Sequence, residues 1–205
     1  MVITVNRRIL CFGDSNTYGY DPRSYLGGRY PASVRWTALL KTGGWEVANA
    51  GENGRCIPRL EQDAKLLSKA ALRTDSEIVT VMLGSNDLLQ QPVPSAEVCA
   101  ERMEWFLTAL LQEMRPSCQV LLAAPPPMKL GAWVSDPGTL VESQRLAGCY
   151  KTLAQRLGIH FADAGNWGVE LAFDGVHFSE QGHRAFADGI RKKLEQIAPL
   201  ASDMC

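Results

Sequence analysis

The sequence predicts an α/β fold in which helices cover both faces of a parallel β-sheet. Short apolar runs, typical of buried strands, alternate with longer segments whose apolar residues recur at helical spacing. No linker, internal repeat or low-complexity tract interrupts this alternation. Because strands that alternate with helices pair in parallel through helical crossovers, we expect a three-layer α/β/α arrangement with a five-stranded sheet. We expect residues 1–205 to form a single domain with one sizeable core.

The five expected strands are short and strongly apolar. The run 78–83, Ile-Val-Thr-Val-Met-Leu, suits the middle of a sheet that is covered on both faces. The run 120–123 ends before Pro125-Pro126-Pro127, which cannot continue a hydrogen-bonded ladder. In chain order, strands are expected at 9–12, 45–49, 78–83, 120–123 and 159–163.

The expected helices carry their apolar residues on one face. In the segment 95–115, Met103, Phe106 and Leu110 recur at helical spacing, which indicates core packing. Ser179 is suited to cap the final helix. The other helices are expected at 35–40, 58–72 and 140–157, and loops at 21–31 and 131–139.

Composition and charge exclude several classes of protein. The formal net charge of -1 gives no reason to expect a nucleic acid or an anionic membrane as partner. No run approaches the roughly 18 apolar residues of a membrane span, and residues 1–8 place their charges after their apolar residues, the wrong order for a secretory signal. Six cysteines without Cys-x-x-Cys pairs indicate reduced thiols in a cytoplasmic protein, with neither a disulfide framework nor a zinc site.

Ser15 is the first candidate for chemistry. It follows the expected strand 9–12 and Gly13, and ligands of open α/β sheets bind beyond the carboxyl ends of the strands. The plainer interpretation is that Ser15 caps the following helix. The Gly-x-Ser-x-Gly motif of the α/β-hydrolases is absent, because Thr17 stands where its second glycine would be.

Asp174 and His177 are the candidates for activating a serine. Three residues apart within a turn, they lie side by side, so the carboxylate can accept the imidazole Nδ1–H and leave Nε2 free to take a proton. This spacing is also common in purely structural turns. His160, in an expected strand, and His183, in the final helix, are interpreted as structural.

Asn86 and Gly54 are the candidates for stabilising an oxyanion. Each follows an expected strand, and a side-chain amide or a backbone N–H can donate to a developing negative charge. Both can equally be ordinary turn residues. The carboxyl ends of parallel strands share one edge, so we expect these two residues to lie near Ser15, Asp174 and His177.

These motifs, taken in order, resemble those of the SGNH (GDSL-like) hydrolases. They are Gly-Asp-Ser at 13–15, Asn-Ala-Gly-Glu-Asn-Gly at 49–54, Gly-Ser-Asn-Asp at 84–87 and Asp-Gly-Val-His at 174–177. The resemblance implies a flavodoxin-like fold, Ser15 as nucleophile, His177 as base and Asp174 as its orienting partner. It further implies an oxyanion hole made by the Ser15 N–H, Gly54 and Asn86. The glycine block can also be aligned on Gly51, and Gly54 is preferred because it sits later in the turn.

Within the family, the sequence 13–19 and the prolines at 125–127 resemble the bacterial arylesterase/acyltransferase branch. Asn16 stands where the family's name has a leucine, and we expect this difference to leave the chemistry unchanged. The branch favours small acyl groups, acetyl especially. The loops 21–31 and 125–139, with Tyr18, Trp133 and Trp167, are candidates for the pocket wall, although packing would explain these aromatic residues equally well.

The expected function is therefore that of a serine ester hydrolase that acts through an acyl-enzyme without a metal or organic cofactor. Its partner would be a small-molecule ester, and the sequence leaves hydrolysis or acyl transfer, and a monomer or a homo-oligomer, open. One alternative is a carbohydrate O-deacetylase of the same family. The other is a flavodoxin-like module that binds phosphate at a helix N-terminus, against which the Asp174–His177 pair argues.

Overall fold

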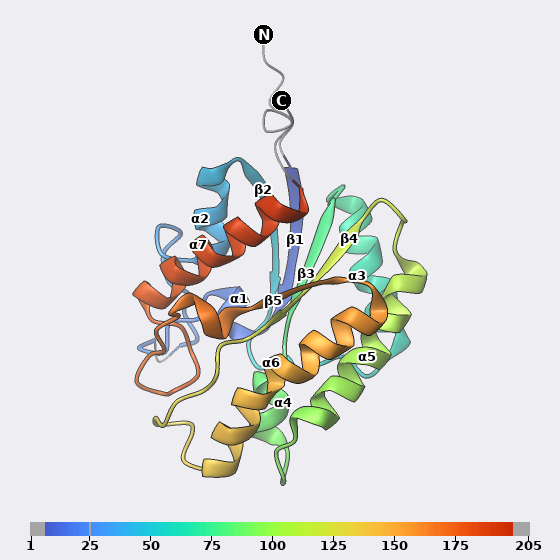
Figure 1. The fold of residues 1–205 in the computed structure, drawn as a ribbon. Helices are drawn as coiled ribbons and strands as arrows, with labels where there is room; N and C mark the ends of the chain where they lie inside the picture. The colour runs from blue at the N-terminus through green and yellow to red at the C-terminus, as the bar shows by residue number, and fades with distance from the viewer. Residues whose placement is uncertain (1–6, 25, 199–205) are drawn as a thin grey trace.

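A five-stranded parallel sheet forms the centre of the protein (Figure 1). The computed structural model describes residues 7–24 and 26–198. The strand order is β2-β1-β3-β4-β5, with every neighbouring pair parallel, which confirms the five expected strands. The strands are β1 (Arg7–Gly13), β2 (Trp45–Gly51), β3 (Ile78–Met82), β4 (Gln119–Ala124) and β5 (His160–Asp163).

Helices cover both faces of this sheet, as expected. In Figure 1, α3 (Glu61–Arg73), α5 (Ala96–Glu113) and α6 (Pro137–Leu157) lie on one side, and α2 (Trp36–Leu39) and α7 (Glu180–Ile197) lie on the other. The short 3₁₀ helix η1 (Leu40–Gly43) continues α2, and η2 (Ala164–Trp167) follows β5.

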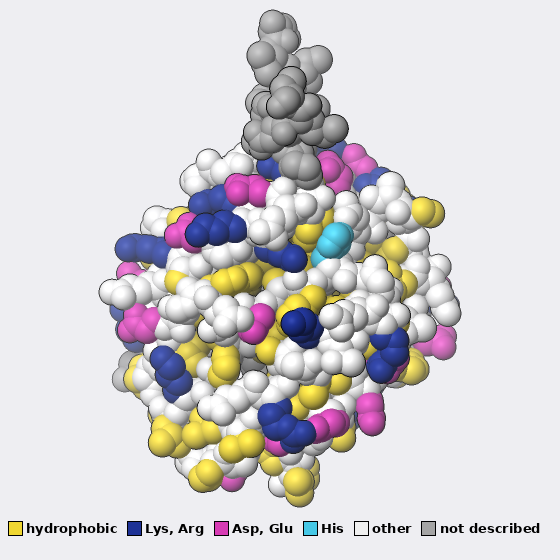
Figure 2. All heavy atoms as spheres, in the orientation of Figure 1, with side chains coloured by type: hydrophobic (Ala, Val, Ile, Leu, Met, Phe, Trp, Pro, Cys, Tyr) yellow, Lys and Arg dark blue, Asp and Glu magenta, His cyan; other side chains and the backbone are white. Residues whose placement is uncertain are grey.

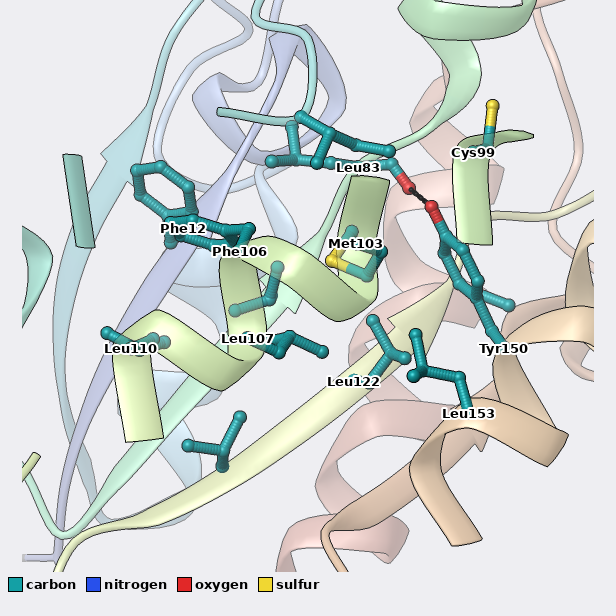
Figure 3. Close-up of a cluster of buried hydrophobic side chains, with 14 of the residues drawn as sticks. Phe12, Leu83, Cys99, Met103, Phe106, Leu107, Leu110, Leu122, Tyr150 and Leu153 are labelled. Carbon is teal, nitrogen blue, oxygen red and sulfur yellow. Dashed lines mark hydrogen bonds between the residues drawn. The ribbon is translucent and has the colours of Figure 1, made fainter. Parts of the chain in front are cut away.

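Side chains of successive strand residues alternate between the two faces and create two hydrophobic clusters. Leu10 and Phe12 of β1 pack with α3, α5 and α6, whereas Ile9 and Cys11 pack with α2 and α7. Figure 3 shows part of the first cluster, in which the buried Tyr150 hydroxyl donates a hydrogen bond to the Leu83 carbonyl at 3.1 Å. Full burial of such apolar side chains stabilises the fold by about 1.5–3 kcal/mol each.

Three helices differ from expectation, of which α3 begins at Glu61 and not at residue 58. α6 begins at Pro137, earlier than residue 140, because the Asp136 carboxylate caps it by accepting from the Thr139 N–H at 2.7 Å and proline fits the first helical turn. Residues after β3 form the helix α4 (Ser85–Gln90), where the sequence suggested only a turn. Among the described residues, no helix is long and apolar enough to span a membrane.

The strand order explains where a site can form. The chain leaves β1 for β2 on one side of it and returns to β3 on the other, so the connections after β1 and β3 diverge. Such a divergence opens a crevice at the carboxyl ends of the two strands. α1 (Ser15–Tyr18) follows β1 and α4 follows β3, which places both at this crevice.

Candidate active site

Ser15 is the first residue of α1, directly beyond β1. The Asp14 carboxylate caps this helix by accepting from the Asn16 N–H at 2.9 Å, so the Ser15 hydroxyl is not needed as the cap. A Cβ on Gly13 would lie 2.8 Å from the Met82 carbonyl oxygen, so a glycine is required where the turn packs on β3. Ser15 is only 6 % exposed.

The structure brings Ser15, His177 and Asp174 into one hydrogen-bonded chain. His177 Nε2 lies 2.9 Å from Ser15 Oγ, and His177 Nδ1 lies 2.6 Å from Asp174 Oδ2. The other carboxylate oxygen, Oδ1, accepts the backbone N–H groups of Val176 and His177, each at 2.9 Å. All three catalytic candidates are therefore buried together at the carboxyl edge of the sheet.

The hydrogen bonds around Asp174 determine which imidazole nitrogen carries a proton. Burial raises the pKa of Asp174, but the hydrogen bonds from His177 and the two backbone N–H groups outweigh it and lower that pKa below its ordinary value. An ionised carboxylate can only accept, so Nδ1 must be the donor. Nε2 of neutral His177 is then left to accept the Ser15 hydroxyl proton.

A loop, rather than a helix or strand, carries Asp174 and His177. The Ala172 N–H donates to the His177 carbonyl at 2.7 Å, and the Trp133 N–H donates to the Asp174 carbonyl at 3.1 Å. Gly175 has a φ of 82°, and a Cβ there would lie 2.1 Å from the Lys129 carbonyl oxygen. Residues 172–178, which we call the base segment, are thus closely packed on the loop 129–134.

Asn86 lies on α4 and holds the loop that contains Gly54. Its side-chain Nδ2 donates to the Arg55 carbonyl at 3.0 Å, and the neighbouring Asp87 carboxylate accepts the Ile57 N–H at 2.9 Å. One Nδ2 hydrogen of Asn86 thereby remains for another acceptor.

The two glycines after β2 differ in their surroundings. The Gly51 N–H donates to Asn49 Oδ1 at 2.8 Å, and a Cβ on Gly51 would lie 2.1 Å from the Tyr18 backbone nitrogen. Gly54 has a φ of 74°, and a Cβ built on it would have no other atom within 4 Å. Its N–H has no hydrogen-bond partner among the residues that the structure describes. Gly51 is therefore a packing residue, whereas Gly54 keeps a free donor.

Two aromatic rings flank His177. The Tyr20 ring centroid lies 4.7 Å from that of His177, and Trp133 makes an edge contact at 4.9 Å on a side chain that is 55 % exposed. Trp167, for which a wall role and a packing role were both open, packs on Phe186 of α7 at 5.1 Å. Trp133 and Tyr20 therefore lie beside His177.

Among the described residues, neither of the other two histidines is hydrogen-bonded to Ser15, Asp174 or His177. His160 stands at the amino end of β5, at the opposite edge of the sheet, with Nε2 2.6 Å from Gln119 Oε1. His183 is fully buried in α7 against Tyr30 and Phe178, and burial lowers its pKa to about 4. Neither contacts Ser15 in the described part of the chain.

Sequence reasoning missed two residues that hold the site together. Asn16 Nδ2 donates to the Val176 carbonyl at 3.1 Å, and Asn16 Oδ1 accepts the Phe178 N–H at 2.9 Å. Arg55 Nη1 donates to the Gly13 carbonyl at 2.7 Å and also to that of Ala50. The only available signals were a polar residue directly after Ser15 and a basic residue in the glycine-rich turn.

The site has the composition of an acid–base and nucleophile centre. Among the described residues, no group of three or more His, Cys, Asp and Glu side chains could hold a metal ion.

On the face drawn in Figure 2, basic side chains (dark blue) and acidic side chains (magenta) are interspersed, and hydrophobic side chains gather at the lower end, beyond the carboxyl ends of the strands.

Comparison with known proteins identifies the family. The model of the GDSL-like lipase/acylhydrolase family matches residues 11–185. A carbohydrate acetylesterase from Sinorhizobium meliloti is 26% identical, with a TM-score of 0.79 over 93% of this chain and 99% of that chain. The inhibitor-bound aryl esterase of M. smegmatis is also 26% identical, with a TM-score of 0.81 over 93% and 99%. No curated protein matches the sequence. The chain belongs to the GDSL-like lipase/acylhydrolase family and is a carboxylic ester hydrolase.

Proposed function

We propose that this protein is a single-domain serine esterase that cleaves small acyl esters through an acyl-enzyme on Ser15. The observation that carries the proposal is the buried chain from Ser15 Oγ to His177 Nε2 at 2.9 Å and from His177 Nδ1 to Asp174 at 2.6 Å. A serine hydroxyl is a weak nucleophile by itself, and a hydrogen-bonded, oriented base is what activates it.

Acylation follows from this geometry. Ser15 Oγ attacks the ester carbonyl carbon while His177 Nε2 takes the hydroxyl proton, and Asp174 stabilises the resulting imidazolium. The tetrahedral intermediate collapses as its bond to the alcohol oxygen breaks, and His177 returns the proton to that oxygen. Water then attacks the acyl-enzyme by the same steps in reverse order, which releases the acid and restores the Ser15 hydroxyl.

The Ser15 N–H, the Gly54 N–H and the remaining Asn86 Nδ2 hydrogen form the proposed oxyanion hole. Support comes from the unpaired Gly54 N–H and from the two hydrogen bonds that fix its loop to α4. Donors that are already oriented need no reorganisation when negative charge develops on the carbonyl oxygen.

The surroundings of His177 favour an aromatic or otherwise flat alcohol portion. Because His177 protonates the departing oxygen, the alcohol must lie beside the imidazole, where Tyr20 and the half-exposed Trp133 are found. Aryl esters of short acids, acetate especially, are therefore the proposed substrates, as the name of the M. smegmatis aryl esterase also suggests. An acetylated sugar is the second candidate, since the S. meliloti neighbour is a carbohydrate acetylesterase and sugar rings also stack on exposed tryptophan.

A phosphate-binding module is the less favoured alternative. α1 has only four residues, and the buried Asp14 carboxylate occupies its N-terminus. A negative charge at that position opposes the binding of an anion. We further propose a cytoplasmic location, supported by free thiols at the described residues Cys11, Cys56, Cys99, Cys118 and Cys149.

The test is the Ser15→Ala variant with p-nitrophenyl acetate as substrate. We expect kcat/KM to fall by at least about 10³-fold, because nucleophile and base act as a unit. Labelling of the wild type by a fluorophosphonate should map to Ser15 and be absent in the variant. A folded variant within tenfold of the wild type, judged by circular dichroism, would remove Ser15 from the mechanism.

The same assay separates the two substrate candidates. Hydrolysis of p-nitrophenyl acetate, a longer-chain p-nitrophenyl ester and an acetylated xylose are compared in the wild type and in Trp133→Ala. A preference for the aryl acetate that Trp133→Ala weakens supports the aryl ester, whereas faster turnover of the acetylated sugar selects the carbohydrate deacetylase.

A further inference from the structure

The side chain of Asn16 connects two parts of the chain that carry the nucleophile and the base. Asn16 follows Ser15 directly, and its amide contacts the backbone on both sides of His177. Nδ2 donates to the Val176 carbonyl at 3.1 Å, and Oδ1 accepts the Phe178 N–H at 2.9 Å. Asn16 is 3 % exposed, so water does not replace these partners readily.

The backbone groups of Asn16 are fixed as well. Its N–H donates to Asp14 Oδ1 at 2.9 Å, and its carbonyl accepts the Trp36 Nε1–H at 2.9 Å. Every polar group of the residue is therefore engaged, and the direction of the amide relative to Ser15 is set by the core of the protein.

Few other polar contacts join these two regions. We call residues 13–19 the nucleophile segment. Within the described parts of the chain, the hydrogen bonds between it and the base segment are the two made by the Asn16 amide and the Ser15–His177 bond itself. In the described part of the chain, the other backbone hydrogen bonds that tie the base segment to another segment go to the loop 129–134.

We propose that Asn16 is a positioning residue, whose two hydrogen bonds to the backbone around His177 set the distance between Nε2 and Ser15 Oγ. This inference rests on the proposed roles of Ser15 and His177. It runs counter to the expectation that an asparagine in place of the family leucine leaves the chemistry unchanged, because a leucine side chain cannot donate to Val176 or accept from Phe178.

The size of the expected effect follows from the distance dependence of proton transfer between the two groups. Without the amide, the Val176 carbonyl and the Phe178 N–H lose their partners, and the base segment can shift relative to Ser15. A misplacement of about 1 Å is enough to cost about 100-fold in rate. The substrate is held by other groups, so KM should change little.

A purely structural role gives a different result. Two lost hydrogen bonds in a buried region would lower the melting temperature, yet well below that temperature the folded enzyme would turn over at the wild-type rate. The two possibilities are therefore separated by kcat measured on folded protein, with stability measured independently.

The experiment compares Asn16→Leu, which is nearly isosteric, with Ser76→Ala. Ser76 is fully buried before β3 at the opposite edge of the sheet, where its hydroxyl is hydrogen-bonded to Thr74 at 2.6 Å. Both variants should lower the melting temperature. With p-nitrophenyl acetate at least about 20 °C below each transition, kcat of Asn16→Leu should fall about 100-fold with KM within about threefold, whereas Ser76→Ala keeps wild-type values.

A second readout uses covalent labelling of Ser15. The fluorophosphonate inactivation rate depends on the same base-activated hydroxyl, so it should fall in Asn16→Leu in parallel with kcat. Asn16→Ala, whose smaller side chain cannot overfill this buried position, replaces Asn16→Leu if the latter does not fold, with the same expected loss.

The outcomes distinguish this inference from the function on which it rests. A folded Asn16 variant with kcat and inactivation rate within threefold of the wild type would overturn the positioning role while Ser15→Ala remains inactive. Activity retained in Ser15→Ala would overturn the proposed function itself. A kcat loss of equal size in Ser76→Ala would show that general destabilisation, not position, causes the effect.

Discussion

The nucleophile segment and the base segment reach the same point by different means. Ser15 follows a strand that is paired on both sides, and the Asp14 cap and a left-handed glycine, Gly19, define a helix of one turn. Asp174 and His177 lie on a loop that belongs to no helix or strand and depends on its hydrogen bonds with the loop 129–134 and with Asn16. Regular structure thus places Ser15, the proposed nucleophile, whereas side-chain and loop contacts place His177, the proposed base.

This contrast implies that the two segments differ in sensitivity. The position of Ser15 is set by a sheet with a large hydrophobic core, so single polar substitutions should not move it. The position of His177 rests on individual hydrogen bonds in a region where Asp174 and His177 are 0 % and 2 % exposed. Each lost bond there leaves a buried polar group without a partner, which costs about 1–3 kcal/mol.

The largest effect in the base segment is expected from Asp174→Asn. The amide would accept from the backbone N–H groups but offer an N–H to His177 Nδ1, which would place the imidazole proton on Nε2, the nitrogen that faces Ser15. We expect kcat for p-nitrophenyl acetate to fall about 10⁴-fold, as loss of the correct tautomer does in serine proteases.

The matched control is Asp163→Asn, because Asp163 also accepts a backbone N–H, that of Gly165 at 2.9 Å, at the end of β5. It should alter stability only. Comparable kcat losses in the two variants would mean that Asp174 supports the fold and does not orient His177.

A smaller effect is expected at the proposed oxyanion hole, where Asn86 is held by the helix α4. Asn86→Ala should lower kcat by about 10²–10³ with little change in KM, because the amide would act mainly in the transition state. Steady-state kinetics with p-nitrophenyl acetate measure the two constants separately. A change confined to KM would assign Asn86 to ground-state binding or to holding the Arg55 loop.

The smallest effect is expected on stability at low pH, and it comes from His183, which packs on Phe178 of the base segment. Burial lowers the pKa of His183 in the folded protein to about 4, against about 6.5 when unfolded. Between these values the unfolded chain binds a proton that the folded protein resists, so stability falls as pH drops from about 6.5 to 4. The full difference amounts to about 3 kcal/mol.

His183→Gln should therefore lose less stability than the wild type between pH 6.5 and 4.5 in denaturant titrations. Burial also raises the pKa of Asp14 to about 6, so protonation of Asp14 increases the stability of the folded protein as the pH falls through the same range. This contribution is the same in the wild type and in His183→Gln, so it does not affect their comparison. Identical pH slopes for the two proteins would show that His183 does not titrate as a buried neutral group.

The sequence predicted most of the fold because its strands are nearly continuous apolar runs. All five strands were expected, with ends within two residues of those observed. α4 was missed, since Ser85, Asn86 and Asp87 are typical of turns and only two apolar residues of this short helix, the buried Leu88 and the partly buried Leu89, pack on the core. To predict the start of α6 correctly, Asp136 would have had to be recognised as its N-cap.

The site was predictable where a motif follows a strand and unpredictable where it depends on tertiary contacts. Ser15, Asn86 and Gly54 could be assigned to one edge from strand order alone. The sequence could not decide whether Gly51 or Gly54 is the better candidate for the oxyanion hole. Gly51 is disfavoured by its close packing on Tyr18, and no local sequence pattern indicates that contact. The contacts of Asn16 with Val176 and Phe178, which lie 160 and 162 positions later in the sequence, could not be predicted either.

The identity of the base is the central claim, and the pH dependence of kcat/KM in three histidine variants tests it most directly. A general base must lose its proton before it can accept one, so activity should rise with pH through a single ionisation. We predict that His160→Gln and His183→Gln keep this acid limb with p-nitrophenyl acetate as substrate, whereas His177→Gln is nearly inactive and shows no such limb. An acid limb that persists in His177→Gln, or that disappears in either of the other two variants, would contradict the assignment of His177 as the base for Ser15.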